Sequence, residues 1–98
     1  MKGGELEKAL DRSENLMVSK DGCPFCKDAS EILKSWKIEF ACIKNTENER
    51  LSKEIEREYG FSTFPKIFLK RKFVGGASDL KEYVKKKEFL DAFGSGRE

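Results

Sequence analysis

The chain has 98 residues, which is the size of one small domain, and 39% of its residues are charged, against about 25% in an average globular domain. Its 20 basic and 18 acidic side chains leave a net charge of +2, so charge alone predicts neither a nucleic-acid nor a membrane partner. No apolar run reaches the roughly 20 residues that span a bilayer, and the first residues lack the apolar segment of a secretory signal, so we expect a single cytoplasmic domain over residues 1–98.

Apolar spacing predicts helices and strands that alternate along the chain. Apolar residues three and four positions apart indicate helices, and short apolar runs indicate strands. After residue 60 the pattern changes to two short strands joined by a tight turn, and Gly75-Gly76 ends the second of them. The expected elements are a helix over about 5–12, a strand over 15–19, a helix over about 24–37, a strand over 38–43, a helix from the cap residues 45–47 to about 59, strands over 66–70 and 72–74, a last helix that begins near 78 or 79 and makes apolar contacts at Leu90 and Phe93, and a polar tail over about 94–98.

This order of elements predicts an α/β fold. A strand–helix–strand unit, followed by a hairpin and a helix, is typical of a mixed sheet. We therefore expect four strands in one sheet, flanked by helices on both faces.

Two cysteines, Cys23 and Cys26, lie where the first strand gives way to a helix. Unpaired backbone N–H groups and the helix dipole favour an anion at a helix start, so we expect Cys23 to be the nucleophilic thiolate and Cys26 the resolving thiol. Pro24 suits the first helical position because its missing N–H would be unpaired there. Lys20 adds positive charge nearby. These features predict Cys23 and Cys26 as catalytic residues of thiol–disulfide chemistry.

Other roles for these cysteines are less favoured. A structural zinc site usually needs four ligands, and the chain has no His and only Cys42 besides the pair, so no metal is expected. A structural disulfide is unexpected in a reducing compartment, and the proline and the helix start favour exposure over an inert buried pair. Cys42 falls in the second strand, where we interpret it as a small buried apolar residue; the alternative is a regulatory or dimer-forming thiol.

Three segments together resemble the glutaredoxin family, the glutathione-dependent branch of the thioredoxin superfamily. The resemblance covers about residues 14–90, and thioredoxin itself would show Trp-Cys-Gly-Pro-Cys. It implies a thioredoxin-like fold and a glutathione-dependent oxidoreductase that reduces protein disulfides and glutathione mixed disulfides. The segments are Lys20-Asp21-Gly22-Cys23-Pro24-Phe25-Cys26, Thr63-Phe64-Pro65 and Gly75-Gly76-Ala77-Ser78-Asp79-Leu80.

The resemblance also implies a glutathione groove beside the dithiol. In the family the proline of the second segment is cis, so Pro65 is expected to turn the backbone of Phe64 toward an extended peptide. Ser78 and Asp79 are expected at the γ-glutamyl end of glutathione, and Lys20 at its glycine carboxylate. The implied glutathione-binding residues are Lys20, Phe25, Thr63, Phe64, Pro65, Ala77, Ser78 and Asp79.

The chain departs from the family pattern at several positions. Phe25 and Phe64 stand where the family more often has Tyr and Val. A basic or amide residue of the second long helix, which contacts the glycine carboxylate in the family, has no clear match; Ser52, Lys53 and Arg57 are the candidates.

Ser78 and Asp79 can also be explained by helix capping alone, without a ligand. Ser78 and Asp79 are favourable N-caps, and Asp79 with Glu82 fits a capping box.

Two further functions stay open beside the glutathione-dependent one. The first is a glutaredoxin-like electron donor that thioredoxin reductase recycles. The second is a module in which two protomers hold a 2Fe–2S cluster through Cys23 and glutathione, although cluster-binding members often carry a single Cys or a smaller residue in place of the motif proline. The expected partners are glutathione and disulfide-containing or glutathionylated proteins, and we expect a monomer.

Overall fold

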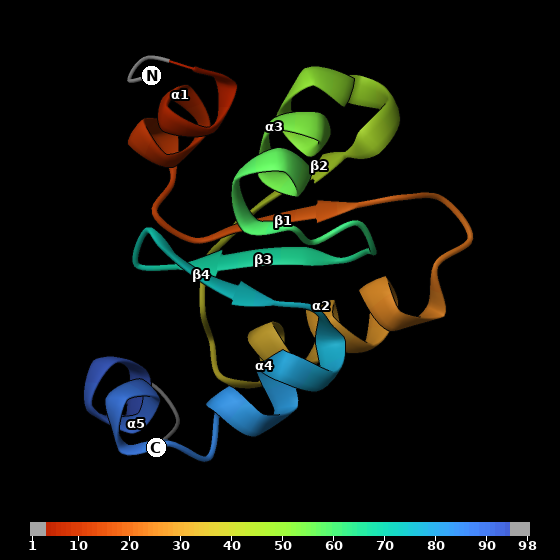
Figure 1. Cartoon of the computed structure of the whole chain (residues 1–98). Coiled ribbons are helices and arrows are strands. Elements are labelled where there is room, and N and C mark those ends of the chain that lie inside the picture. Colours follow the sequence, from red (N-terminus) through yellow and green to blue (C-terminus); the bar gives the residue numbers. More distant parts are fainter. Residues whose placement is uncertain (1–3, 95–98) are drawn as a thin grey trace.

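Five α-helices, four strands and one 3-10 turn make up the part of the chain that the computed structural model describes, residues 4–94 (Figure 1). None of these helices combines the length and apolar character needed to cross a lipid bilayer. The elements are α1 Glu5–Arg12, β1 Leu16–Ser19, α2 Pro24–Ser35, β2 Ala41–Lys44, η1 Asn45–Glu47, α3 Glu49–Tyr59, β3 Lys66–Leu69, β4 Lys72–Gly75, α4 Ala77–Tyr83 and α5 Lys87–Phe93.

The four strands form one mixed sheet in the order β2-β1-β3-β4. β1 runs parallel to β2, with Val18 beside Ile43, and antiparallel to β3, with Met17 beside Ile67. β3 and β4 form an antiparallel hairpin. The strand–helix–strand unit and the hairpin predicted from the sequence are thus both present, which confirms the α/β fold.

Helices cover both faces of this sheet: α1 and α3 lie on one face, and α2 and α4 on the other (Figure 1). Because side chains alternate along a strand, neighbouring residues of β1 and β3 enter different cores. The core under α1 and α3 contains Leu16, Val18 and Phe68. The core on the α2 and α4 face contains Met17, Ile67 and Leu69 instead. Removing such side chains from water stabilises the fold by about 1.5–3 kcal/mol for each fully buried residue.

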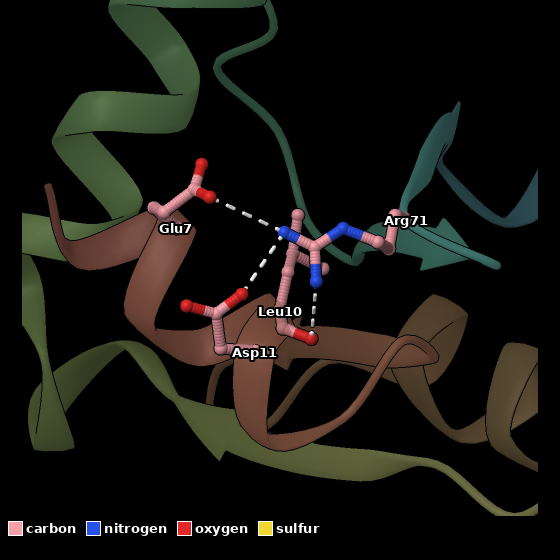
Figure 2. Close-up of polar contacts among 4 residues, drawn as sticks. All are labelled: Glu7, Leu10, Asp11 and Arg71. Carbon is pink, nitrogen blue, oxygen red and sulfur yellow. Dashed lines mark hydrogen bonds and ion pairs between the residues drawn. The ribbon is translucent and has the colours of Figure 1, made fainter. Parts of the chain in front are cut away.

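The turn between β3 and β4 fixes the N-terminal helix. Both central residues of the turn, Lys70 and Arg71, have positive φ values of 52° and 68°, as a type I′ hairpin turn requires. The guanidinium of Arg71 donates to the carbonyl oxygen of Leu10 over 3.0 Å and forms ion pairs with Glu7 and Asp11 at 3.4 and 3.1 Å (Figure 2). The last carbonyl groups of a helix lack partners within it, so Arg71 caps α1 and ties it to the hairpin.

The C-terminal region differs from the prediction, because it forms two helices in place of one. The chain leaves the helical conformation at Lys86, whose φ of −86° and ψ of 151° are extended, and α5 begins at the next residue. This break lets Phe89 become fully buried with its ring 4.9 Å from that of Trp36. The predicted apolar contact at Leu90 is wrong, since that side chain is 44% exposed. Of the predicted polar tail, residues 95–98 lie outside the described part.

Cys42 is exposed, so its interpretation as a buried apolar residue is wrong. Ala41 and Ile43 pack against the core under α1 and α3, and Cys42 between them therefore points to the other face. β2 is an edge strand, and on that face the side chain of Cys42 stays accessible, with its sulfur 3.5 Å from the hydroxyl of Ser19.

Candidate active site

The two cysteines of the dithiol face each other across the first turn of α2. Cys23 is the N-cap of this helix, with Pro24 as the first helical residue. The backbone N–H of Cys26 donates to the sulfur of Cys23 over 3.2 Å, and the Cys26 thiol donates to the same sulfur over 2.6 Å. Both cysteines are free thiols. The sulfur of Cys23 therefore lies where an N-terminal helix turn and a thiol donor can stabilise negative charge.

Burial separates the roles that the two thiols can take. Cys26 is only 6% exposed, and this burial, followed by its hydrogen bond to Cys23, raises the pKa of the Cys26 thiol from 9.0 to about 12. Cys26 is therefore protonated at neutral pH. Cys23 is partly exposed and can meet an external disulfide. The pair is thus not an inert buried pair.

A groove of about 390 Å³ adjoins the dithiol at Phe25, the residue between Pro24 and Cys26. It brings together three segments that are far apart in the sequence. Six of the eight residues that the sequence predicts for glutathione binding line it: Phe25, Thr63, Phe64, Ala77, Ser78 and Asp79. Its other lining residues are Phe61, Gly76 and Lys81.

The two remaining predicted residues lie beside the groove without lining it. The peptide bond between Phe64 and Pro65 is cis, as expected. The carbonyl oxygen of Phe64 lies 3.8 Å from the sulfur of Cys23, so this loop borders the dithiol directly. The ammonium group of Lys20 lies 5.6 Å from the centre of the Phe64 ring. One positive charge is therefore available near the end of the groove closest to Phe64.

The start of α4 forms the opposite side of the groove, with caps that differ from the prediction. Gly76, rather than Ser78 or Asp79, is the N-cap. The carboxylate of Asp79 accepts a hydrogen bond from the backbone N–H of Gly76 over 2.9 Å, whereas Glu82 forms an ion pair with Lys85 at 3.6 Å. The predicted pairing of Asp79 with Glu82 is therefore wrong, because Asp79 occupies the third helical position and not the cap.

Gly75 permits the carboxylate of Asp79 to lie close to the backbone at the start of α4. Its φ of 120° disfavours any side chain, and a Cβ atom there would collide with the carboxylate of Asp79. The glycine pair therefore serves a close contact as well as the end of β4.

The candidates on α3 for a glycine-carboxylate contact do not reach the groove. Ser52 is 2% exposed, and its hydroxyl has no hydrogen-bond partner among the described residues. Lys53 and Arg57 line a different hollow, which they share with Gly4 and Glu54 between α1 and α3. The sequence could not separate these candidates, because the side that each presents depends on how α3 packs.

Three residues near the site were not predicted. Phe61 and Lys81 line the groove, and Lys66 is fully buried behind it. An aromatic residue two positions before Thr63 was the only signal for Phe61, and nothing in the sequence distinguished Lys81 or Lys66 from the many other lysines.

Comparison with known proteins identifies the family. The family model described as Glutaredoxin matches residues 15–74, more than half of the chain. Glutaredoxin-1 of Rhizophagus irregularis is 31% identical over 78 residues, which cover 76% of this chain and 77% of that protein. Glutaredoxin 3 of Escherichia coli is 31% identical over 64 residues, which cover 65% of this chain and 77% of that protein.

Solved structures share the fold. The holo form of glutaredoxin C1 from Populus tremula x tremuloides has a TM-score of 0.76 at 21% identity, over 93% of this chain and 96% of that chain. A buckwheat glutaredoxin–glutathione complex has a TM-score of 0.74 at 16% identity, over 93% of this chain and 92% of that chain. With a thiol pair at a helix start and the family match over residues 15–74, this chain belongs to the glutaredoxin family and is a thiol–disulfide oxidoreductase.

Proposed function

We propose that this oxidoreductase depends on glutathione and reduces both protein disulfides and glutathione mixed disulfides. The observation that carries the proposal is the groove of about 390 Å³ between the loop over residues 61–64 and the start of α4, which meets the dithiol at Phe25. A ligand in this groove can place a sulfur beside Cys23. The solved complex of the buckwheat glutaredoxin with glutathione supports this choice of ligand.

The proposed reaction begins with the Cys23 thiolate. It attacks the glutathione sulfur of a mixed disulfide, a bond between Cys23 and glutathione forms, and the substrate leaves as a thiolate that takes up a proton. The thiolate of a second glutathione then attacks the glutathione sulfur bound to Cys23. This step releases glutathione disulfide and restores the Cys23 thiolate.

Protein disulfides follow a second route through Cys26. Cys23 attacks the protein disulfide, and Cys26 loses its proton and attacks Cys23, which releases the reduced protein and leaves a Cys23–Cys26 disulfide. In the resting protein, hydrogen bonding and charge from Cys23 both add to the burial that raises the pKa of Cys26. Those two contributions end once Cys23 forms a mixed disulfide, because its sulfur then carries no negative charge. Cys26 thus becomes easier to ionise at the moment when it must react.

The charged ends of glutathione match the groups around the groove. We assign Ser78 and the neighbouring backbone to the γ-glutamyl carboxylate, Asp79 to the γ-glutamyl ammonium, and Lys20 to the glycine carboxylate. The backbone of Thr63 and Phe64 pairs with the cysteinyl residue of the ligand. Phe25 and Ala77 form part of its walls, and the cis bond before Pro65 sets the backbone of Phe64 beside them.

A pair of coupled assays tests this function. Reduction of a glutathionylated peptide is followed once with glutathione and glutathione reductase, and once with thioredoxin reductase alone. We expect turnover only with glutathione, loss of turnover in Cys23→Ser, retention in Cys26→Ser, and no change in the control Cys42→Ser. Activity in both active-site variants, or recycling by thioredoxin reductase alone, would contradict the proposal. A visible absorption spectrum of anaerobically purified protein that shows an iron–sulfur chromophore would favour the cluster-binding alternative.

A further inference from the structure

A buried lysine lies behind the groove. Lys66 is the first residue of β3, and its side chain is 0% exposed. Its ammonium group donates to the carbonyl oxygens of Thr63 and Phe61 over 2.9 and 3.0 Å, and it forms an ion pair with Glu56 of α3 at 3.6 Å. A charge taken out of water is costly unless it is hydrogen-bonded and paired, and here the two carbonyl oxygens accept its hydrogen bonds while Glu56 supplies the opposite charge.

The same ammonium group also contacts the aromatic wall of the groove. It lies 4.2 Å from the centre of the Phe64 ring and 5.7 Å from that of Phe61. A cation this close to an aromatic face is attracted by it, most strongly where water is excluded. Both rings line the groove, whereas Lys66 does not. One buried charge therefore contacts two carbonyl groups and two rings of a single groove wall.

This wall is held by side-chain contacts: besides Lys66, the Phe61 ring lies 5.3 Å from that of Phe73 in β4, and Phe64 packs against the core under α1 and α3. Residues 61–64 belong to no helix or strand, so their conformation depends on contacts such as those of Lys66. The Phe61 ring in turn packs against Gly76, where an added Cβ atom would lie 3.2 Å from the ring. Displacement of Phe61 would therefore disturb the start of α4 on the far side of the groove as well.

We propose that Lys66 is a positioning residue for thiol–disulfide exchange, which holds residues 61–64 in the conformation that receives the glutathionyl ligand beside Cys23. This inference rests on the proposed glutathione-dependent function. Lys66 acts through Thr63 and Phe64 and does not touch the ligand. Burial lowers the pKa of Lys66, and the neighbouring carboxylate of Glu56 partly offsets this effect.

The test compares Lys66→Met with a matched control, Lys70→Met. Lys70 follows the other end of β3, and its ammonium group faces the Phe93 ring at 5.5 Å, away from the groove. KM and kcat are measured with a glutathionylated peptide, together with the rate at which iodoacetamide alkylates Cys23. Alkylation reports the nucleophile alone, since iodoacetamide needs no groove. We expect Lys66→Met to raise KM about tenfold, the size expected for losing a charged hydrogen bond, with alkylation within about twofold of wild type. The control should leave both unchanged.

A second variant keeps the inference testable if Lys66→Met does not fold. Lys66→Gln retains an N–H donor but loses the charge, and it should raise KM by a smaller factor at unchanged alkylation. Adding Phe64→Leu completes a double-mutant cycle: if Lys66 acts through Phe64, Lys66→Gln should change KM less in that background than in wild type.

The outcomes separate the two proposals. The positioning role would be overturned by an unchanged KM in the folded Lys66 variant, or by strictly independent effects of Lys66→Gln and Phe64→Leu on KM. Either result would leave the proposed function intact if the wild-type protein is active with glutathione. A wild-type protein without glutathione-dependent activity would overturn both.

Discussion

The backbone N–H of Cys26 donates a hydrogen bond to the sulfur of Cys23 across 3.2 Å. The first turn of α2 thus donates a hydrogen bond to the sulfur of Cys23 and places the side chain of Cys26 in the protein interior. Cys23 is partly exposed, and Cys26 is buried. The nucleophile and the resolving thiol are therefore distinguished by burial on the same short segment.

The first prediction concerns the pH dependence of Cys26. The pKa of this thiol is raised from 9.0 to about 12, chiefly by burial, which persists in Cys23→Ser. At about pH 8 iodoacetamide should therefore alkylate Cys26 more slowly in the folded variant than in the same chain in denaturant, and the rate in the folded variant should still rise with pH above 9. Peptide mapping after timed iodoacetamide treatment gives both rates. Equal rates in folded and unfolded protein would show that Cys26 is not protected.

The second prediction separates two roles of Asp79. Its carboxylate accepts the N–H of Gly76, and in the proposed function it also meets the ammonium group of glutathione. Asp79→Asn keeps a hydrogen-bond acceptor but loses the charge, so KM for glutathione should rise about tenfold with little change in the melting temperature. Asp79→Ala should in addition lose about 1 kcal/mol of stability, because the N–H of Gly76 loses its partner.

Glu82→Gln is the matched control for Asp79. Glu82 lies on the same helix but is paired with Lys85 and does not line the groove. It should leave glutathione kinetics unchanged. If Asp79→Asn also leaves KM for glutathione unchanged, Asp79 serves the helix start alone.

The third prediction concerns the Arg71 contacts to α1. Arg71→Ala removes a hydrogen bond to the carbonyl of Leu10 and two partly exposed ion pairs, and it should lower the free energy of unfolding by about 1 kcal/mol. Faster amide hydrogen exchange should be confined mainly to α1. Lys87→Ala, which removes an exposed pair with Asp91 within α5, is the control and should change little. Equal effects of the two substitutions would mean that Arg71 does not secure α1.

Local patterns explain which parts of the fold and the site the sequence could predict. The strands β1 and β3 are short apolar runs, and the dithiol, the Thr-Phe-Pro segment and the glycine pair are contiguous motifs. Their assembly around one groove follows from the family resemblance. The break at Lys86 was not predictable from spacing, because it depends on the packing of Phe89 against Trp36, far apart in the sequence.

Long-range packing decided what the sequence left undetermined. An apolar pattern assigns Cys42 to a strand but does not say that this strand lies at the edge of the sheet, and edge position is what leaves the thiol exposed. Likewise, the sequence places Lys66 at the start of a strand but does not predict its burial. That burial depends on tertiary contacts with Glu56 and the carbonyl oxygen of Thr63.

Trapping of the glutathionyl intermediate tests the proposed chemistry most directly. The Cys26→Ser variant is treated with glutathione disulfide, and the product is examined by intact mass and peptide mapping before and after addition of reduced glutathione. We predict one glutathionyl group per chain, attached to Cys23 and removed by reduced glutathione, and no glutathionyl group in a chain that carries both Cys23→Ser and Cys26→Ser. An adduct confined to the exposed Cys42, or a Cys23 that stays unmodified, would contradict the assignment of Cys23 as the nucleophile of a glutathione-dependent oxidoreductase.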